Sequence, residues 1–415
     1  MSDLLSVDEA LARILIDFQC LKSEPVPLDH AWGRVLAQDI TAPHALPPFA
    51  NSSMDGFAVR AANLKDATKD QPVRLRVVAD IPAGHAAAIV LKDGEAARIM
   101  TGAALPEGSD AVIPVEETDA NFQKGQPLAI GSEVSVYAAL KPGDSVRAIG
   151  EDVRAGDTVL SEGMLISPGA VGVLAALGIA EVPMVRRPRV AIISSGDELV
   201  PVEMPLTPGT IHDANSYTLS ALIRQYGAVP LRIPTARDTL DDVRRAFQEA
   251  LDSGADVILS SAGVSVGAVD LVRTVLEQMG QLSFWRINLR PGKPLAYGRV
   301  GEVPFFGLPG NPVSAMVTFE VFVRPVLLKL AGRTDQPQTI QAALAEDIPA
   351  DGRRTYFRVT LQAEKDRWIA HLTGTQSSGA LSSMVKADGL LILPEGVTFA
   401  PAGSVYSVRV LRPLV

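Results

Sequence analysis

The residues from Val190 to Leu330 alternate between apolar runs of strand length and amphipathic segments of helix length. Strand-like runs begin near Val190, Val229 and Asp256. Helix-like segments cover about 216–226, 240–252, 269–279 and 313–330. This alternation predicts βαβ units, and therefore a mostly parallel, doubly wound α/β sheet. Ligands of such sheets bind beyond the carboxyl ends of the strands, so the loops there are the first candidates for a site.

The sequence on either side of this domain has a different character. Ser6 and Glu9 form a capping box before an amphipathic helix. From Val26 to about Leu140, short alternating runs separated by Pro, Gly and Asp indicate a β-rich module. Short β runs return from Thr334 to Val415, which predicts a small C-terminal β-domain.

Composition narrows the function classes. A formal charge of −9 over 415 residues argues against a general affinity for nucleic acid or anionic membranes. The N-terminus lacks the pattern of a secretory signal, and no apolar run approaches the length that spans a bilayer, so we expect a soluble, cytoplasmic protein. The single cysteine, Cys20, excludes an intrachain disulfide and any multi-cysteine metal site. We expect it to be a small buried hydrophobe.

Two acidic residues follow the first strand of the α/β domain. The segment SSGDEL, from Ser194 to Leu199, places Asp197 and Glu198 at the end of that strand. Carboxylates there are able to hold a divalent cation, but a capped, solvated turn explains them equally well.

The segment from Asp256 to Gly267, DVILSSAGVSVG, is an apolar run that ends in a loop of Ser and Gly before a helix. Backbone N–H groups at a helix N-terminus favour an anion, so Ser260, Gly263, Ser265 and Gly267 are candidate phosphate ligands. Asp270 caps this helix or binds a metal, and capping is the simpler interpretation. The GxSxG match at Gly263 does not indicate a hydrolase, because Ser260 to Ala262 separate it from the strand and His371 is the only downstream histidine.

Two further loops carry positive charge and rigid turns. Arg290 and Lys293 flank a Pro-Gly turn, and Arg286 lies on the preceding strand-like run. These cations suit an oxyanion site, although a basic turn is more often a solvated loop. In LPGNPVS, Pro309 and Pro312 frame a turn before Ser314, which either aims helix N–H groups at a ligand or simply connects a strand to a helix.

These segments, together with NSSMDGFAV from Asn51, RIMTGAALPEGSDAVIPVEE from Arg98 and GEDVRAGD from Gly150, resemble the molybdopterin molybdenumtransferase family. The family comprises bacterial relatives of the C-terminal part of gephyrin. The resemblance covers essentially the whole chain, with seven segments in the right order. It implies that molybdenum from molybdate is inserted into the dithiolene of adenylylated molybdopterin, with release of AMP and a requirement for Mg²⁺.

The resemblance also assigns candidate residues. Its acidic positions, given as candidate catalytic residues, are Asp55, Asp152, Glu198, Asp238 and Asp270. Its substrate-binding positions are Thr101, Arg286, Arg290, Lys293, Pro309, Pro312 and Ser314, with Arg358 and Ser378 added from the C-terminal domain. We expect Glu198 and Asp270 to position Mg²⁺ against the pyrophosphate, the backbone from Ser260 to Gly267 to hold phosphate, and Arg290, Lys293 and Ser314 to hold molybdate.

The resemblance further implies a homodimer in which the β-rich module of one subunit borders the cleft of the other, so that Asp55 and Thr101 act across the interface. A molybdopterin adenylyltransferase is a possible partner. Four domains follow, with the bounds 1–25 plus 41–50 plus 141–180 (linker domain), 26–40 plus 51–140 (inserted β-rich module), 181–332 (molybdopterin-binding α/β domain) and 333–415 (C-terminal β-domain).

Two positions depart from the usual family pattern. Ala262 replaces a second Gly in the loop after Asp256, and Arg290 replaces the common Lys. Arg keeps the charge and is able to bind an oxyanion through two N–H groups. The alternatives are an adenylyltransferase that acts one step earlier or a non-catalytic scaffold. The first would not need the NSSMDGFAV module, and the second would not need an intact set of charged residues.

Overall fold

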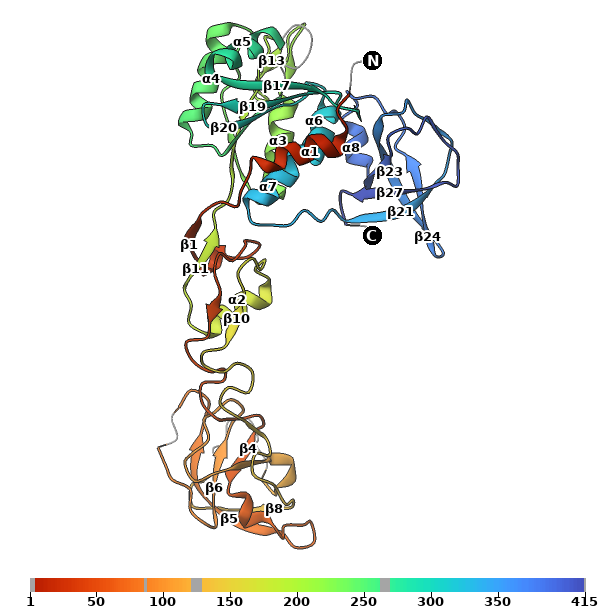
Figure 1. Ribbon diagram of the computed structural model, residues 1–415. Coiled ribbons are helices and arrows are strands. Elements are labelled where there is room, and N and C mark those ends of the chain that lie inside the picture. The colour runs from red at the N-terminus through yellow and green to blue at the C-terminus, as the bar shows by residue number, and fades with distance from the viewer. Residues whose placement is uncertain (1–3, 86–87, 121–128, 262–268, 414–415) are drawn as a thin grey trace. The chain divides into compact units, whose positions relative to one another are not determined.

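The computed structural model of the chain describes residues 4–85, 88–120, 129–261 and 269–413 (Figure 1). The chain forms two compact units: Met1–Val26, Gly33–Ala37 and Pro183–Val415 make the first, and Pro27–Trp32 and Gln38–Val182 make the second. The boundaries fall within β1 (Ser23–Pro27) and β11 (Glu181–Val185), among other places. The finer division into four domains stays a prediction.

The first unit contains the α/β sheet that the sequence predicts. Its strand order is β15-β12-β16-β20-β19-β17. The parallel strands are β15 (Val229–Arg232), β12 (Arg189–Ile193), β16 (Val257–Ser260) and β20 (Val303–Gly307). The strand β19 (Pro294–Val300) is antiparallel to both of its neighbours, β20 and β17 (Gly280–Arg286). The prediction of a mostly parallel, doubly wound sheet is therefore confirmed.

Helices cover both faces of this sheet (Figure 1). Successive side chains of a strand point to opposite faces, and β12 shows the result. Val190 and Ile192 pack with α1 (Val7–Ile16), α3 (Ala214–Gln225), α6 (Pro312–Thr318) and α7 (Arg324–Leu330). Ala191 and Ile193 pack with α4 (Leu240–Asp252) and α5 (Val269–Met279). A π-helical turn, η4 (Phe319–Val323), joins α6 to α7.

The helix α1 begins where the capping box predicts, since the Ser6 side chain accepts a hydrogen bond from the backbone N of Glu9. Its buried face packs on the α/β sheet, where the Tyr297 hydroxyl donates to the Asp17 carboxylate at 2.6 Å. The sequence grouped residues 1–25 with 41–50 and 141–180, whereas this helix belongs to the core of the first unit. The expectation of a buried Cys20 is wrong: the residue lies beyond the end of α1 and is exposed.

The C-terminal part of the first unit is a β-barrel. Its strands follow the order β18-β23-β24-β21-β27-β25, and the additional pairing of β23 with β25 closes the barrel. They are β18 (Leu289–Arg290), β21 (Thr339–Leu344), β23 (Arg354–Glu364), β24 (Arg367–Leu372), β25 (Gly389–Leu393) and β27 (Val405–Val410). The strand β18 comes from the connection between β17 and β19, so the α/β domain contributes a short strand to this second sheet.

The second unit is rich in strands, as its alternating sequence predicts. Its main sheet has the order β7-β4-β6-β5-β8, formed by Ala111–Pro114, Gly56–Val59, Glu95–Ile99, Val73–Ile81 and Glu133–Val136. Gly56 is required for the close approach of β4 to β7, because a Cβ there would lie 2.0 Å from the Ile113 carbonyl oxygen. A helix, α2 (Pro168–Ala176), begins after Ser167, whose side chain accepts from the backbone N of Ala170.

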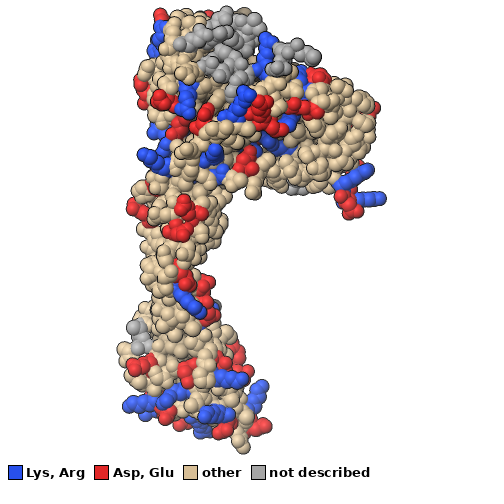
Figure 2. All heavy atoms as spheres, in the orientation of Figure 1, with Lys and Arg blue, Asp and Glu red and all other residues tan. Residues whose placement is uncertain are grey.

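Charges of both signs are interspersed on the face shown in Figure 2, and neither sign covers a broad area of it. None of the helices in the described ranges combines the length and the apolar character that a membrane span needs.

Candidate active site

A cavity of about 400 Å³ lies where the connection between β17 and β19 meets the C-terminal barrel. The register of β18 on β23 explains this position, because Leu289 lies opposite Arg354 and Arg290 opposite Thr355. We call it the cationic cavity. Its lining residues are Arg290, Pro291, Gly292, Lys293, Ser314, Arg353, Thr355, Tyr356, Phe357, Arg358, Gln376, Ser377 and Ser378. Five residues proposed from the sequence are thus brought together: Arg290, Lys293, Ser314, Arg358 and Ser378.

Arg358 is the most deeply buried cation of this cavity, with 1% of its surface exposed. Its guanidinium donates to the Ser383 hydroxyl at 3.1 Å and to the carbonyl oxygens of Ser377 at 3.1 Å and Thr375 at 3.4 Å. It has no carboxylate partner among the described residues. Burial, with the nearby charge of Arg290, lowers the pKa of Arg358 to about 10, so it remains protonated at neutral pH. A buried cation of this kind favours the entry of an anion.

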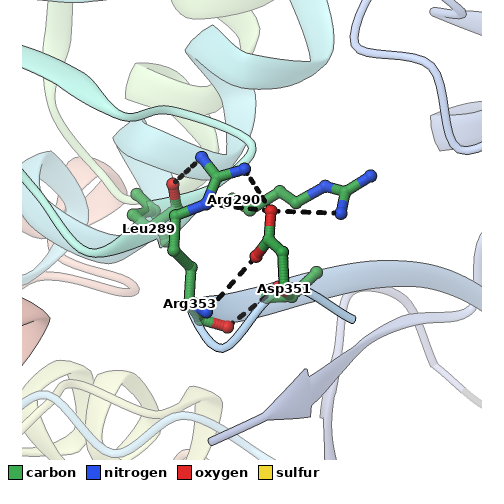
Figure 3. Close-up of polar contacts among 5 residues, drawn as sticks. Leu289, Arg290, Asp351 and Arg353 are labelled. Atoms are coloured by element: carbon green, nitrogen blue, oxygen red, sulfur yellow. Dashed lines mark hydrogen bonds and ion pairs between the residues drawn. The ribbon is translucent and has the colours of Figure 1, made fainter. Parts of the chain in front are cut away.

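Three charged side chains meet at one side of the cavity (Figure 3). The Asp351 carboxylate lies between the guanidinium groups of Arg290 and Arg353. It accepts from the Arg290 Nη1 at 3.3 Å and from the Arg353 Nε at 3.1 Å, and it also contacts the Arg353 Nη2. Arg353 further donates to the Leu289 carbonyl oxygen at 3.4 Å. The hydrogen bond from Arg353 lowers the pKa of the Asp351 carboxyl group below its ordinary value.

The other members of the cavity differ in how they are held. Lys293 is exposed, and its ammonium group has no hydrogen bond or ion pair within the described part of the chain. Ser314 is buried in α6, and the adjacent Val313 N donates to the Ser378 carbonyl oxygen at 3.1 Å. Gly292 has φ +118°, and a Cβ there would lie 2.5 Å from the Thr318 hydroxyl oxygen.

A second, larger hollow of about 930 Å³ lies at the carboxyl ends of β12 and β15. We call it the strand-edge cleft. Its lining includes Asp197, Asp213, Tyr217, Arg232 and Arg237. The Arg232 guanidinium lies 4.0 Å from the centre of the Tyr217 ring, which gives this cleft a flat cationic and aromatic wall.

Of the acidic residues considered from the sequence after β12, Asp197 lines this cleft and Glu198 is its neighbour in the chain. The Asp197 carboxylate accepts from the backbone N of Asp238 at 3.2 Å, which joins the loops after β12 and β15. Glu198 is exposed, and its carboxylate lies over Gly196, within 2.8 Å of the position that a Cβ there would take. Asp270 lies in the first turn of α5, and its side chain is outside the described residues.

The carboxylates fit Mg²⁺ only in part. Hard oxygen ligands are the right chemistry, and Mg²⁺ is commonly held by one or two carboxylates together with substrate phosphates. Within the described ranges, no three His, Cys, Asp or Glu side chains gather closely enough to hold a metal on their own. A cation bound at Glu198 would therefore take most of its ligands from the substrate and from water.

The serines at the ends of β12 and β16 are used by the fold itself. The Ser194 and Ser261 hydroxyl oxygens lie 3.0 Å apart and both residues are buried. The Ser261 N donates to the Ile193 carbonyl oxygen, and the Ser260 carbonyl oxygen accepts from Leu308 N. These particular backbone groups are not directed at a ligand. Gly263, Ser265 and Gly267, the remaining candidate phosphate ligands, lie outside the described residues.

The remaining predicted positions of the first unit lie at the same carboxyl edge of the sheet. Arg286 is exposed at the end of β17, and its backbone oxygen accepts from Leu5 N. Pro309 is buried just after β20, and Pro312 begins α6. The Gly310 carbonyl oxygen between them accepts from the Asn215 side chain at 2.7 Å.

The second unit brings together Asp55 and Thr101. Because β4 and β6 are antiparallel with Gly56 opposite Ile99, the residue before β4 lies near the residues after β6. The Asp55 carboxylate accepts from the Thr101 N at 2.7 Å and from the Thr101 hydroxyl at 2.8 Å. Asp152 also belongs to this unit, where it is exposed and its backbone N donates to the Leu46 carbonyl oxygen.

Sequence reasoning missed Asp351, Arg353 and Gln376 at the cationic cavity, and Tyr217 and Arg232 at the strand-edge cleft. Arg353 lies five residues before Arg358, which the resemblance assigned, so its charge is a usable signal. Asp351 precedes Gly352 in a sequence typical of a turn, which gave no reason to separate it from an ordinary loop residue.

Comparison with known families covers most of the chain. Residues 5–178 match the MoeA N-terminal region (domain I and II), residues 191–329 match the probable molybdopterin binding domain, and residues 341–411 match the MoeA C-terminal region (domain IV).

Individual relatives agree with this match. The chain is 40% identical over 394 residues to molybdopterin molybdenumtransferase 2 of Mycobacterium tuberculosis, covering 92% of this chain and 94% of the relative. It is 35% identical to the molybdopterin molybdenumtransferase of Bacillus subtilis, covering 98% and 94%. A solved structure of the molybdopterin biosynthesis MoeA protein of Pyrococcus horikoshii superposes with a TM-score of 0.82 at 32% identity, covering 99% of this chain and 100% of that one.

Proposed function

Because the chain belongs to the molybdopterin molybdenumtransferase family, we propose that it transfers molybdenum from molybdate to the dithiolene of adenylyl-molybdopterin and releases AMP. The observation that carries this proposal is the cationic cavity, a space of about 400 Å³ that is lined by four positively charged side chains. Such a cavity suits a tetrahedral dianion in a chain whose net charge is negative.

The reaction needs no nucleophilic side chain. Two molybdenum–sulfur bonds form as the two thiol protons leave with one molybdate oxygen as water. A second water cleaves the phosphoanhydride bond to give AMP and the pterin phosphate, so the water released equals the water consumed and no oxidation state changes. The work of the protein is to hold both substrates and to balance their negative charge.

We assign molybdate to the cationic cavity, held by Lys293, Arg290, Arg358 and Ser314. The nucleotide end of the substrate is assigned to the strand-edge cleft, where Tyr217 and Arg232 offer a flat surface to a base. Mg²⁺, when bound, neutralises charge on the phosphoanhydride. Glu198 would hold it together with substrate oxygens, and Asp270 is the second proposed ligand.

The transfer is tested with purified protein, adenylyl-molybdopterin, Mg²⁺ and molybdate, by following AMP release. We expect release to depend on molybdate, and molybdate-independent release or none at all contradicts the assignment. Lys293→Ala should raise the KM for molybdate more than that for the pterin substrate. Arg367→Ala is the matched control, because Arg367 is an exposed cation at the start of β24 with only a 3.8 Å surface ion pair.

We further propose that the protein acts in the cytoplasm as a homodimer in which Asp55 and Thr101 serve the active site of the other subunit, with a molybdopterin adenylyltransferase as the supplier of substrate. The hydrogen bonds between Asp55 and Thr101 support a shared role for this pair. Mixing inactive Asp55→Asn and Glu198→Gln proteins after subunit exchange should restore up to about a quarter of the activity, because half of the dimers then contain one intact site. No recovery, with exchange shown by mass spectrometry, contradicts an intersubunit role.

A further inference from the structure

The ionic contacts of Asp351 differ in strength on its two sides. Arg353 holds the carboxylate through Nε and Nη2 and is itself fixed to the Leu289 carbonyl oxygen. Arg290 makes a single contact with Asp351, at 3.3 Å. Both side chains of this pair are more than a third exposed, at 45% for Arg290 and 37% for Asp351. An exposed pair with one contact is weakly held, so Arg290 is the side chain that can leave.

Positive side chains outnumber negative ones around the cationic cavity. Arg290, Lys293, Arg353 and Arg358 line it, and no carboxylate stands among its lining residues. Within the described part of the chain, Asp351 is the carboxylate that pairs with these cations. An anion in the cavity therefore competes with Asp351 for Arg290.

We propose, on the basis of the function proposed above, that Asp351 is a positioning residue that serves as the internal counter-ion of Arg290. It holds the Arg290 guanidinium while the cavity is empty and gives it up to an entering oxyanion. In this way Asp351 limits how tightly the cavity binds molybdate and keeps the oxyanion transferable. Arg353 acts as the anchor that keeps Asp351 in place during the exchange.

The first test is the binding of molybdate to the full chain by isothermal titration calorimetry, without the pterin substrate. Asp351→Asn keeps the shape of the side chain and an acceptor for Arg353 while removing the negative charge. We expect this variant to bind molybdate roughly three- to tenfold more tightly, as removing one like charge beside a dianion in a water-exposed site should do. The gain should shrink as salt is added. Asp351→Glu should restore the affinity of the original protein.

The matched control is Asp8→Asn. Asp8 pairs with Arg354, the neighbour of Arg353, through contacts of 2.6 and 2.7 Å, and neither residue lines the cavity. Its loss should leave molybdate binding unchanged.

A double-mutant cycle tests whether Asp351 acts on molybdate binding through Arg290. In an Arg290→Gln background, Asp351→Asn should gain less than half of the affinity that it gains in the original protein, because Arg290 is no longer there to be released. An equal gain in both backgrounds, or unchanged or weaker binding by Asp351→Asn alone, overturns the inference. If the original protein binds no molybdate, the assignment of molybdate to the cationic cavity fails too. If the original protein binds molybdate but Asp351→Asn does not bind it more tightly, only the role of Asp351 fails.

Discussion

Replacing Arg358 with Met should weaken oxyanion binding by one to two orders of magnitude, at roughly 1.5–3 kcal/mol, while leaving the fold nearly as stable as before. A buried guanidinium without a carboxylate partner is costly to the folded state, because burial penalises the charged form. The lowering of the Arg358 pKa to about 10 corresponds to a cost of roughly 3–4 kcal/mol. The hydrogen bonds to Ser383, Ser377 and Thr375 offset a similar amount, at roughly 1 kcal/mol or more each.

Met is apolar and unbranched, so it removes the cost of burying the charge and the hydrogen bonds that offset this cost together. We expect the free energy of unfolding to change by less than about 1.5 kcal/mol. Molybdate binding should weaken by a factor of about 10 to 150, since a charge-assisted hydrogen bond contributes roughly 1.5–3 kcal/mol. The effect on stability should be constant across neutral pH, because Arg358 is protonated in both the folded and unfolded states until the pH approaches 10.

The assay pairs molybdate titration calorimetry with guanidinium unfolding of the same preparations. Arg358→Lys is the companion variant, since it keeps a charge but loses the fork of donors and should retain part of the affinity. A loss of more than about 3 kcal/mol in stability with unchanged molybdate affinity would refute the reasoning, because that is the signature of a buried group needed by the fold.

Three further predictions concern catalysis, backbone geometry and acid stability. Glu198→Gln should abolish AMP release while leaving the melting temperature nearly unchanged, because this carboxylate is exposed; a large drop in melting temperature would instead make Glu198 structural. Gly292→Ala should destabilise the protein by about 2–4 kcal/mol in guanidinium unfolding, since φ is +118° and the new Cβ would lie 2.5 Å from the Thr318 hydroxyl oxygen; an unchanged midpoint contradicts this. Arg354 lowers the pKa of Asp8 below its ordinary 3.8, so this pair stabilises the fold above that value and the stabilisation is lost as the pH falls through the lowered folded-state pKa. Thermal melts from pH 5 to about pH 2 should therefore decline less steeply for Asp8→Asn, and equal slopes would show that the pair does not contribute.

The α/β core could be predicted from the sequence because local signals and tertiary packing agree there. The predicted helices 240–252 and 269–279 coincide with α4 and α5, because apolar residues at helical spacing form one face that is buried against the core, which here is the sheet. Ligands of such sheets bind beyond the carboxyl ends of the strands, and this rule makes the loop with Arg290 and Lys293 a candidate for the site. It could not show what lies opposite them. The pairing of β18 with β23 involves two residues on each strand, which leaves no periodicity to detect.

The rest of the cavity depended on resemblance or was not foreseen. Arg358 sits in an apolar β run, where its charge alone does not indicate whether it faces solvent or a cavity. Ser378 lies in a polar segment with no pattern of its own. Asp351 has the sequence context of a turn, and only the structure shows that it joins two arginines that stand more than sixty positions apart. Cys20 was misplaced because the helical spacing continues past Ile16, where α1 ends.

The cationic cavity is precise only if the barrel and the α/β domain are held together, and β18 is too short to do this alone. A buried ionic cluster adds a further contact between them. Glu320 in η4 accepts from the Tyr226 hydroxyl at 2.6 Å and pairs with Arg324 at 3.3 Å and with Arg409 of β27 at 3.9 Å. Burial raises the pKa of Glu320, while its hydroxyl and arginine partners oppose that shift. Removing the Glu320 carboxylate would leave Arg409 without its carboxylate partner, while Arg324 would keep Asp335 at 2.6 Å. The contact between β27 and η4 would then be weakened. The geometry of oxyanion binding therefore depends on side chains that never touch the oxyanion.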